Sequence, residues 1–273
     1  MSMSTEKPLN QTNKNTIYIP PKRSFSHYVK LLLIVGVVFL LHYWSVRGIE
    51  VNPDRISFER TLDFLSRTFP PNWEVTQTVM GAALETLQIA IIGTTGGAIL
   101  SIPFGFLAAS NIVHPTVRVC VRTLLNTIRS IPLILYALFF VVAVGLGPLA
   151  GTLATVIYSV GMLGKFYSEA IEAIDPKPVE GILSTGASKL KALRYGIIPQ
   201  VLPHFIAYTF YRFELNFREA TILGLVGAGG IGFYITLYMR SFEYTRLATV
   251  TFIILVMVVV IDMLSSYLRK KIT

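Results

Sequence analysis

Long apolar runs separated by short charged stretches form the main pattern of this chain. A helix that crosses a bilayer needs about 20 mostly apolar residues. Residues 31–46 are uncharged although somewhat short, and residues 86–117 hold a second run, whose helix is expected to end near Ala109. The last run, 247–268, is interrupted by Asp262. The pattern predicts an all-α membrane protein.

The uncharged run 130–164 is too long for one crossing. As a single helix it would measure about 52 Å, against about 30 Å for the hydrocarbon core. The sequence Gly-Leu-Gly-Pro at 145–148 supplies a break, so we expect two helices joined by a tight turn. A fifth span is expected to begin near Gln200 and to run through 213–219. The chain should therefore form a bundle of about six transmembrane helices.

The segment 220–239 is uncharged and long enough to span, but it is rich in glycine. Glycine weakens helices, and irregular backbone at membrane depth is tolerated only inside protein or beside a cavity. We therefore predict a re-entrant or loop conformation. Two roles stay open for its glycines, close helix packing or a gate between two copies of the chain. The residues concerned are Gly227, Gly229, Gly230 and Gly232.

Basic residues predict the orientation of the bundle, because Lys and Arg collect on cytoplasmic flanks. Six spans with both termini in the cytoplasm leave few basic residues outside, namely Arg47, Arg55, Arg60, Arg67, Arg240 and Arg246. Residues 1–29 are polar and are expected to form a mobile cytoplasmic segment, followed by a transmembrane domain at 30–273. Glu85 is expected at the start of the second span, where a carboxylate suits a helix N-terminus.

Composition excludes several classes of function. The chain is 53% hydrophobic and 14% charged, whereas soluble domains are roughly 25% charged. Its net charge of +9 is spread between apolar runs, so membrane lipid and not nucleic acid is the expected partner. Cys120 is the single cysteine and the histidines are scattered, so no metal site is expected. The chain contains no Gly-x-x-x-x-Gly-Lys-Ser/Thr phosphate loop, so it should not hydrolyse ATP by that route.

A motif between the fourth and fifth spans points to a function. Glu180, Gly186 and Pro199 resemble the coupling-loop signature of permease subunits in ATP-binding-cassette (ABC) importers. That pattern is Glu-Ala-Ala, three residues, Gly, nine residues, then Ile-x-Leu-Pro. The resemblance implies a loop over about 170–199 with a short cytoplasmic helix that docks on a partner ATPase.

The chain departs from this family pattern at four positions. Gly181 and Ile182 replace the two alanines, Gly196 replaces the isoleucine and Ile198 the leucine. Glycine at 186 would let the chain turn tightly. The residues that the resemblance assigns to the coupling loop are Glu180, Gly181, Ser184, Gly186, Ala187, Ser188 and Pro199.

The sequence at 211–232, together with 144–148 and 161–165, is similar to the phosphonate-transporter permease family. The resemblance extends from about residue 86 to the C-terminus. It implies the fold of a type I ABC-importer permease in the bacterial inner membrane, in two copies. It also implies two ATPase subunits that carry ATP and Mg, an external solute-binding protein, and phosphonate or phosphite as cargo. Phosphate or another small solute on the same fold remains an alternative.

Placing charged residues within the fifth span costs free energy, so their side chains should face a partner or a water-filled pathway. At 100° per residue, Arg212, Asn216 and Glu219 share one face with Tyr208 beside them, whereas Arg218 pairs with Glu214 on another. Two roles stay open for these residues: one face lines the pathway, or the charges form internal ion pairs that hold helices together. The pathway candidates are Tyr208, Arg212, Asn216, Arg218 and Glu219.

Two other classes of function are weaker interpretations. A membrane enzyme would need a catalytic cluster at the membrane surface, and the sequence shows none. A passive channel or scaffold would have no use for an ATPase-docking loop.

Overall fold

The computed structural model describes residues 25–47 and 57–272, and all regular structure in these ranges is helical. Helix α1 (Phe25–Arg47) forms a unit of its own. It is long and apolar enough to cross a membrane, as predicted for 31–46, although it begins earlier. Residues 1–24, and with them most of the predicted mobile segment 1–29, lie outside the described residues, as does Arg55.

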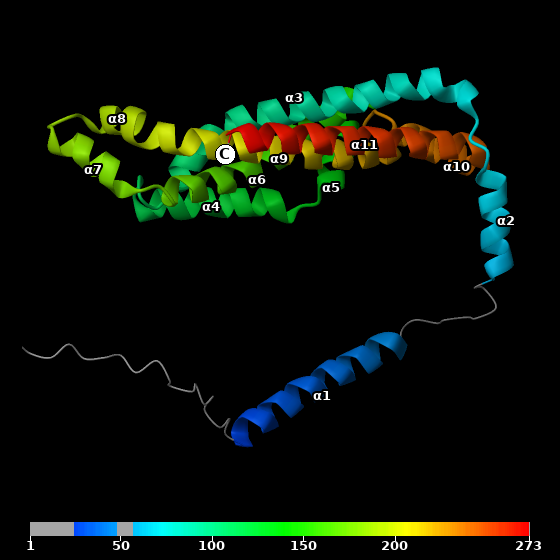
Figure 1. Ribbon diagram of the computed structural model, residues 1–273, viewed down its shortest axis with the longest axis horizontal. Helices are drawn as coiled ribbons and strands as arrows, with labels where there is room; N and C mark the ends of the chain where they lie inside the picture. Colours follow the sequence, from blue (N-terminus) through cyan, green and yellow to red (C-terminus); the bar gives the residue numbers. More distant parts are fainter. Residues whose placement is uncertain (1–24, 48–56, 273) are drawn as a thin grey trace, which may run out of the picture. The chain divides into compact units, whose positions relative to one another are not determined.

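The second unit is a helical bundle with a short helical extension at each end (Figure 1). Its α-helices are α2 (Phe58–Thr68), α3 (Thr76–Ala108), α4 (Pro115–Ser130), α5 (Leu133–Val144), α6 (Pro148–Glu172), α7 (Pro176–Ser184), α8 (Lys189–Ala192), α9 (Ile198–Leu223), α10 (Gly232–Arg240) and α11 (Tyr244–Ile272). Within the described ranges, α1, α3, α6 and α11 could each cross a membrane, and α4 with α5 makes a bent fifth candidate.

Helices α3 and α6 form the centre of the bundle and run in the same direction. Gly93 faces Thr155 and Gly97 faces Ser159, and Gly105 further along lies against Tyr167. A methyl group on Gly105 would lie 2.7 Å from the Cβ atom of Tyr167. The two backbones approach this closely because one helix has no side chain at the contact, as is usual for packed membrane helices.

The predicted break at 145–148 is confirmed. Helix α5 ends at Val144, Gly145 and Gly147 have φ angles of 95° and 129°, and Pro148 opens α6. Only glycine adopts such angles without strain, and proline suits the first helical turn. Helix α5 has 12 residues, about 18 Å, which is too short to cross alone. The candidate for a crossing between α3 and α6 is therefore the α4–α5 pair, bent by 84° where Pro132 follows Ile131 in extended backbone.

Helix α9 has 26 residues, about 39 Å. It packs against α3, α6 and α11, but it is too polar to count as a span by composition. After α9 the chain makes a 3-10 turn at Gly224–Val226, and α10 then has nine residues. As expected, residues 220–239 do not form one continuous spanning helix.

The start of the second span differs from the prediction. Helix α3 begins at Thr76, after a short 3-10 turn whose N-cap Asn72 accepts a hydrogen bond from the N–H of Glu74 (2.9 Å). Glu85 therefore lies well inside α3 and does not cap its N-terminus. The charge-free run marked the apolar part of the helix, whereas the helix itself continues through a glutamate, which is a good helix former.

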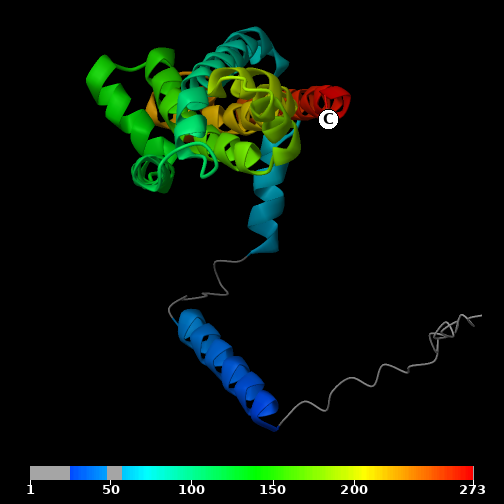
Figure 2. The same cartoon turned by 90° about the vertical axis from the view of Figure 1, so that its left-hand side faces the viewer.

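The two ends of the bundle differ. Helices α7 and α8 extend beyond the end at which α3 and α6 finish, and α2, α10 and the start of α11 lie at the other end (Figure 1). A buried apolar cluster lies towards each end, one around Tyr167, Ile197 and Val201 and the other around Val79, Ile231 and Val250. Figure 2 views the same bundle along its length from the α7 end.

Candidate functional site

The predicted coupling motif forms a short helix with a defined start and end. Asp175 caps α7 by accepting a hydrogen bond from the N–H of Lys177 (3.0 Å), and Pro176 is its first residue. At the other end Gly186 has φ = 76°, and its N–H donates to the carbonyl of Leu183 (3.0 Å). Glycine is the residue that takes this left-handed conformation after a helix with least cost.

The two ends of the coupling loop are tied together by Gln200 in the first turn of α9. Its Oε1 accepts from the N–H of Asp175 (3.0 Å), and its Nε2 donates to the carbonyls of Asp175 (3.2 Å) and Gly196 (2.7 Å). A methyl group on Gly196 would lie 3.2 Å from the Cα atom of Val179. The glycine at 196, where the family pattern has isoleucine, thus allows α7 to pack against the start of α9.

The predicted docking residues lie on the outside of this loop. Ala187 is half-buried, and the other six are exposed: Glu180, Gly181, Ser184, Gly186, Ser188 and Pro199. Leu183 on α7 and Leu190 on α8 are also exposed, the second at 74%. A short amphipathic helix with exposed leucines beyond the end of the bundle is a surface suited to a protein partner.

A buried polar network joins three helices inside the bundle. Arg212 of α9 is 1% exposed, and its Nη2 donates to Glu219 Oε2 at 2.7 Å. Its Nε donates to Ser159 Oγ of α6 at 3.3 Å, and its guanidinium carbon lies 4.8 Å from the ring centre of Tyr158. The positive charge is thus held by a carboxylate, a hydroxyl and an aromatic face.

Asn216 extends this network to α3. Its side-chain N–H groups donate to Thr94 Oγ1 (2.7 Å) and to Ser159 Oγ (2.9 Å). Its Oδ1 is buried and has no hydrogen-bond partner among the described residues. The predicted face of Arg212, Asn216 and Glu219 therefore exists, and in a single copy it points largely into the bundle.

The other two pathway candidates lie apart from this network. Tyr208 packs against Phe166, with ring centres 5.3 Å apart. Arg218 pairs with Glu214 (2.7 Å), as predicted, and approaches Asp262 of α11 (3.7 Å). Arg269 of α11 also reaches Glu214 (3.3 Å). This second cluster connects α9 to α11 and includes the charge that interrupts the last apolar run.

The glycine segment folds into a turn that is held by α3. Gly227, Gly229 and Gly230 have φ angles of 81°, 85° and 83°. The N–H of Gly230 donates to Glu85 Oε1 and the next N–H, of Ile231, donates to Thr86 Oγ1, both at 2.8 Å. These N–H groups precede α10, so the carboxylate that was expected at the start of α3 instead binds near the N-terminus of α10.

The same turn contacts the break between α5 and α6. The N–H of Gly147 donates to the carbonyl of Gly227 (2.9 Å), and Gly151 packs against the carbonyl of Ala228. A pocket of about 570 Å³ opens beside Glu85, Gly147 and Gly229. Gly232 has a different role, since a methyl group there would collide with the carbonyl of Thr221.

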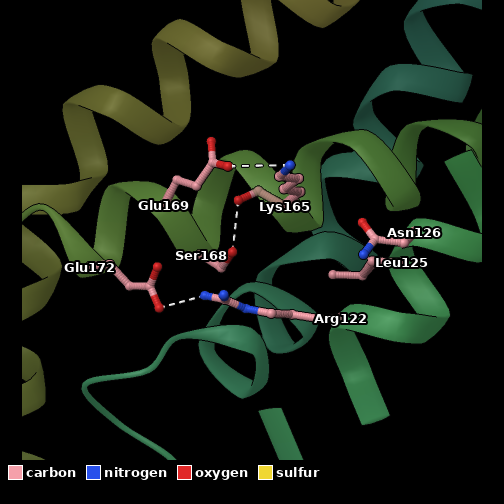
Figure 3. Close-up of a pocket in the computed structure, with 7 residues that line it drawn as sticks. All are labelled: Arg122, Leu125, Asn126, Lys165, Ser168, Glu169 and Glu172. Carbon is pink, nitrogen blue, oxygen red and sulfur yellow. Dashed lines mark hydrogen bonds and ion pairs between the residues drawn. The ribbon is translucent and has the colours of Figure 1, made fainter. Parts of the chain in front are cut away.

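A third polar cluster joins the middle of α4 to the last turns of α3 and α6 near the coupling loop (Figure 3). Arg122 of α4 donates to Glu172 of α6 (2.5 Å) and to the carbonyl of Ala108 (2.9 Å). Lys165 lies 3.6 Å from Glu169. Because its cations and carboxylates pair with one another, this small pocket joins helices and leaves little charge for a ligand.

Sequence reasoning missed the partners that α3 and α6 supply. Ser159 and Thr94 are ordinary small polar residues, and no local pattern marks them as partners of Asn216. One signal was available, the four-residue spacing of Gly93, Gly97, Ser101 and Gly105, which indicates a closely packed membrane helix. In the described ranges, no three His, Cys, Asp or Glu side chains gather as a metal site would require.

Comparison with known proteins agrees with this geometry. The phosphite transport system permease protein PtxC of Stutzerimonas stutzeri is 37% identical over 242 residues, which is 88% of each chain. The putative phosphite permease HtxC of the same organism is 39% identical, over 91% of this chain and 86% of its own length. The phosphate-import permease PhnE of Mycolicibacterium smegmatis is 40% identical over 76% of this chain but only 39% of its own.

Solved structures show the same fold at lower identity. A chain of the MetNI methionine ABC transporter in an inward-facing conformation aligns with a TM-score of 0.67 and 20% identity, covering 74% of this chain and 99% of that one. Residues 101–273 match the family described as the inner membrane component of binding-protein-dependent transport systems. The chain therefore belongs to this family, and it is an inner-membrane permease component of an ABC importer and not the ATPase.

Proposed function

We propose that this permease forms the translocation pathway for phosphonate or a related phosphorus oxyanion, in a complex of two copies with two ATPase subunits and an external solute-binding protein. The observation that carries the proposal is the similarity to two phosphite permeases over at least 86% of their lengths. Phosphate stays an alternative substrate, because a phosphate-import permease is equally similar over a shorter stretch.

The proposed energy input enters through α7. The ATPase would hold the exposed face around Glu180 and Leu183, and Gln200 would pass its movement to α9 because it bonds both ends of the loop. Tyr167 of α6 stacks on Phe205 of α9 with ring centres 4.0 Å apart, so α6 would follow. The binding protein must bind one conformation more tightly than the other, since only differential affinity shifts such an equilibrium.

Of the pathway candidates, we propose that Tyr208, Arg218 and Glu219 line the pathway between two copies, because each keeps accessible surface in one copy. Arg212 and Asn216 are buried. Arg212 would fix the position of Glu219 through their ion pair. Asn216 would support Arg212 through Ser159, to which both donate. Arginine suits this cargo, since its planar fork binds two oxygens of an oxyanion. Binding must also remain weak enough for release, which a half-exposed and already paired Arg218 satisfies.

We further propose six crossings with both termini in the cytoplasm and a transmembrane domain at 30–273. Helix α9 would be the fifth crossing, and α10 would complete it. Helix α10 ends near the start of α3, because the N–H of Asn72 donates to the carbonyl of Thr245 just beyond α10 (3.1 Å). The basic end of α11, with Arg269, Lys270 and Lys271, would then lie on the side of the coupling loop, as the positive-inside rule requires.

The test of the transported molecule is uptake into proteoliposomes that hold the complete complex. Radiolabelled phosphite, methylphosphonate and phosphate are offered with the solute-binding protein, with and without internal ATP. We expect ATP-dependent accumulation of phosphite or methylphosphonate above the external concentration. Equilibration without ATP would instead identify a passive pore, and accumulation of phosphate alone would identify the alternative substrate.

Replacing Gly186 by valine tests the coupling loop. We expect uptake to fall about tenfold while the amount of assembled complex stays unchanged. The reason is that φ = 76° costs a side-chain-bearing residue roughly 1–2 kcal/mol, and a β-branched residue more, so the turn after α7 would shift. The matched control is Gly181→Ala within α7, which restores the family alanine and has open space around it in the described structure. Equal uptake by both variants would contradict the assignment.

We propose that the turn at Gly227–Gly230, named the glycine turn, is part of a gate. The hydrogen bond from the N–H of Gly230 to Glu85 would hold this gate closed. The turn bonds to α3 through Glu85 and to the α5–α6 break through Gly147. Opening the turn would therefore separate α3 from the α5–α6 break within each copy, and we propose that this widens the pathway. Close packing remains the role of Gly232, whose position leaves no space for a side chain.

Glu85→Ala should loosen this gate. The reporter is Ala228→Cys in a Cys120→Ser background, because Ala228 is fully buried in the glycine turn. We expect its rate of modification by a water-soluble thiol reagent to rise about tenfold, equivalent to about 1.4 kcal/mol, which a lost charge-assisted hydrogen bond can supply. Glu85→Gln keeps an oxygen acceptor for Gly230 and should leave the rate within about twofold of the parent. An unchanged rate of thiol modification in the alanine variant would show that Glu85 does not hold the gate closed.

A further inference from the structure

Helix α2 has two contrasting faces, although it lies outside the sites described above. Its apolar side chains recur at helical spacing, so that they share one stripe. Opposite this stripe, Asp63 and Arg67 form an ion pair at 3.0 Å, with Glu59 on the same side. The residues of the stripe, named here the α2 stripe, are Phe58, Leu62, Leu65 and the following Phe69.

The α2 stripe is uncovered in the described structure. Exposed fractions are 76% for Phe58, 49% for Leu62, 46% for Leu65 and 63% for Phe69. Every residue of α2 is at least partly accessible. Large apolar side chains gathered on one face of a helix indicate a binding partner, and the question is which one.

The position of α2 in the bundle favours lipid. The helix lies across the end of the bundle and extends sideways from it, whereas α3 and α11 run along the bundle (Figures 1 and 2). The Phe64 ring of α2 packs edge-on against Tyr244 at the start of α11, with ring centres 5.1 Å apart. If α11 crosses the bilayer, a helix placed across its end lies in the plane of the membrane surface.

The last residue of the α2 stripe, Phe69, lies beside exposed apolar side chains of α11. Phe64, Thr68 and Phe69 share an apolar groove of about 340 Å³ with residues of α11 that include Phe252 and Leu255. The latter two are 50% and 58% exposed, as expected for side chains facing acyl chains. Arg67 instead borders a second pocket with Glu243 and Arg246, at the extreme end of the bundle. The α2 stripe thus meets the exposed apolar surface of α11 at Phe69, whereas Arg67 lies with polar residues at the end of the bundle.

We propose that α2 is an interfacial helix that binds the outer leaflet of the bilayer, with the α2 stripe among the upper acyl chains and Asp63 and Arg67 towards water. An amphipathic helix of this kind lies in the membrane plane, with its apolar face buried roughly 5–10 Å into the boundary of headgroups and chains. The occupant is lipid because the stripe meets the exposed apolar surface of α11 at Phe69 and its other residues are exposed at the same end of the bundle. The leaflet assignment rests on the proposed topology, in which α7 is cytoplasmic.

The test measures the depth of a fluorophore on each face of α2. In a Cys120→Ser background, Leu65→Cys and Leu62→Cys place a nitrobenzoxadiazole label on the stripe, and Asp63→Cys places the matched label on the opposite face. The complete permease–ATPase complex is reconstituted in nanodiscs of phosphatidylethanolamine and phosphatidylglycerol, with and without lipids brominated near the headgroup. We expect at least a twofold loss of emission at 62 and 65, and less than about 20% at 63.

Three results would overturn the proposal. Equal quenching at 63 and 65 would show that the helix does not lie with its stripe in lipid. Unquenched labels at 62 and 65 that become shielded only when the solute-binding protein is added would identify a soluble partner. Labels already shielded in detergent, in proportion to protein concentration, would identify a second copy. The measurement requires no transported solute, so a complex that fails to import a phosphorus oxyanion still gives a decisive result.

Discussion

Replacing Arg212 by methionine is expected to remove most of the assembled permease from the membrane. Methionine matches the length of the aliphatic part of the side chain but leaves Glu219 without the cation that lies 2.7 Å from it. It also removes a donor to Ser159 and the charge above Tyr158. Breaking a fully buried pair from one side costs about 3–5 kcal/mol. Glu219 is 32% exposed and regains part of this from water, so we expect the lower end of the range, which is still a large part of the stability of a typical domain.

The measurement is the amount and melting temperature of the detergent-extracted permease, followed by size-exclusion chromatography. Arg218→Met is the matched control. Arg218 is 46% exposed, and Glu214 would keep Arg269 as a partner, so we expect a change in melting temperature of less than about 3 °C, since exposed pairs contribute roughly 0–1 kcal/mol.

A second variant separates the loss of charge balance from the loss of packing. Arg212→Met combined with Glu219→Gln removes the uncompensated carboxylate, so this double variant should recover a substantial part of the assembled protein. If Arg212→Met alone is as stable as the parent, the buried network has no structural role. If the double variant assembles but does not import, the same residues also serve the pathway, which is the alternative left open by the sequence.

Local features of this fold follow from sequence because their causes are local. The break at 145–148 needs backbone angles that glycine provides, and Pro148 cannot continue a preceding helix. The turn after α7 needs the left-handed angle of Gly186. The shared face of Arg212 and Glu219 follows from helical geometry, since residues seven apart lie on one side. Each of these features follows from the local sequence without any tertiary contact.

The partners of those residues depend on which helices pack together, which no single segment determines. Ser159 meets Asn216 only because α6 lies beside α9, and Thr94 joins them only because α3 runs parallel to α6. The predicted position of Glu85 at the start of the second span was wrong for the same reason. Its tertiary partner, the N–H of Gly230, is 145 positions away in sequence. This hydrogen bond stabilises a carboxyl group inside a long apolar helix.

Replacing Gly97 in the middle of α3 by leucine is expected to have an effect as large as the loss of Arg212. Its α-carbon faces Ser159, and a methyl group there would overlap the Cβ atom of that serine and lie 3.2 Å from the carbonyl of Val156. The backbone carbonyl cannot rotate away as a flexible side chain would. Overpacking of this kind costs about 1–3 kcal/mol, and a leucine would force the two central helices further apart than a single methyl group.

Two effects combine at this position. Ser159 is also the shared acceptor of Arg212 and Asn216, so a side chain that displaces it weakens the buried network at the same time. We therefore expect Gly97→Ala to lower the melting temperature by several degrees and Gly97→Leu to leave almost no assembled permease. Gly81→Ala is the control in the same helix, because its position has open space in the described structure and alanine favours helix by roughly 1 kcal/mol.

The outcome for these three variants distinguishes close helix packing from a general intolerance of α3 to substitution. If Gly81→Ala is as harmful as Gly97→Ala, the helix is sensitive for reasons other than its contact with α6. If Gly97→Leu assembles with the stability of the parent, α3 and α6 do not approach as closely as their facing small residues indicate. Adding Ser159→Gly to Gly97→Ala removes the colliding Cβ atom but also the hydroxyl, so packing should recover only in part. A complete recovery would show that the hydroxyl of Ser159 contributes little to holding Arg212 and Asn216.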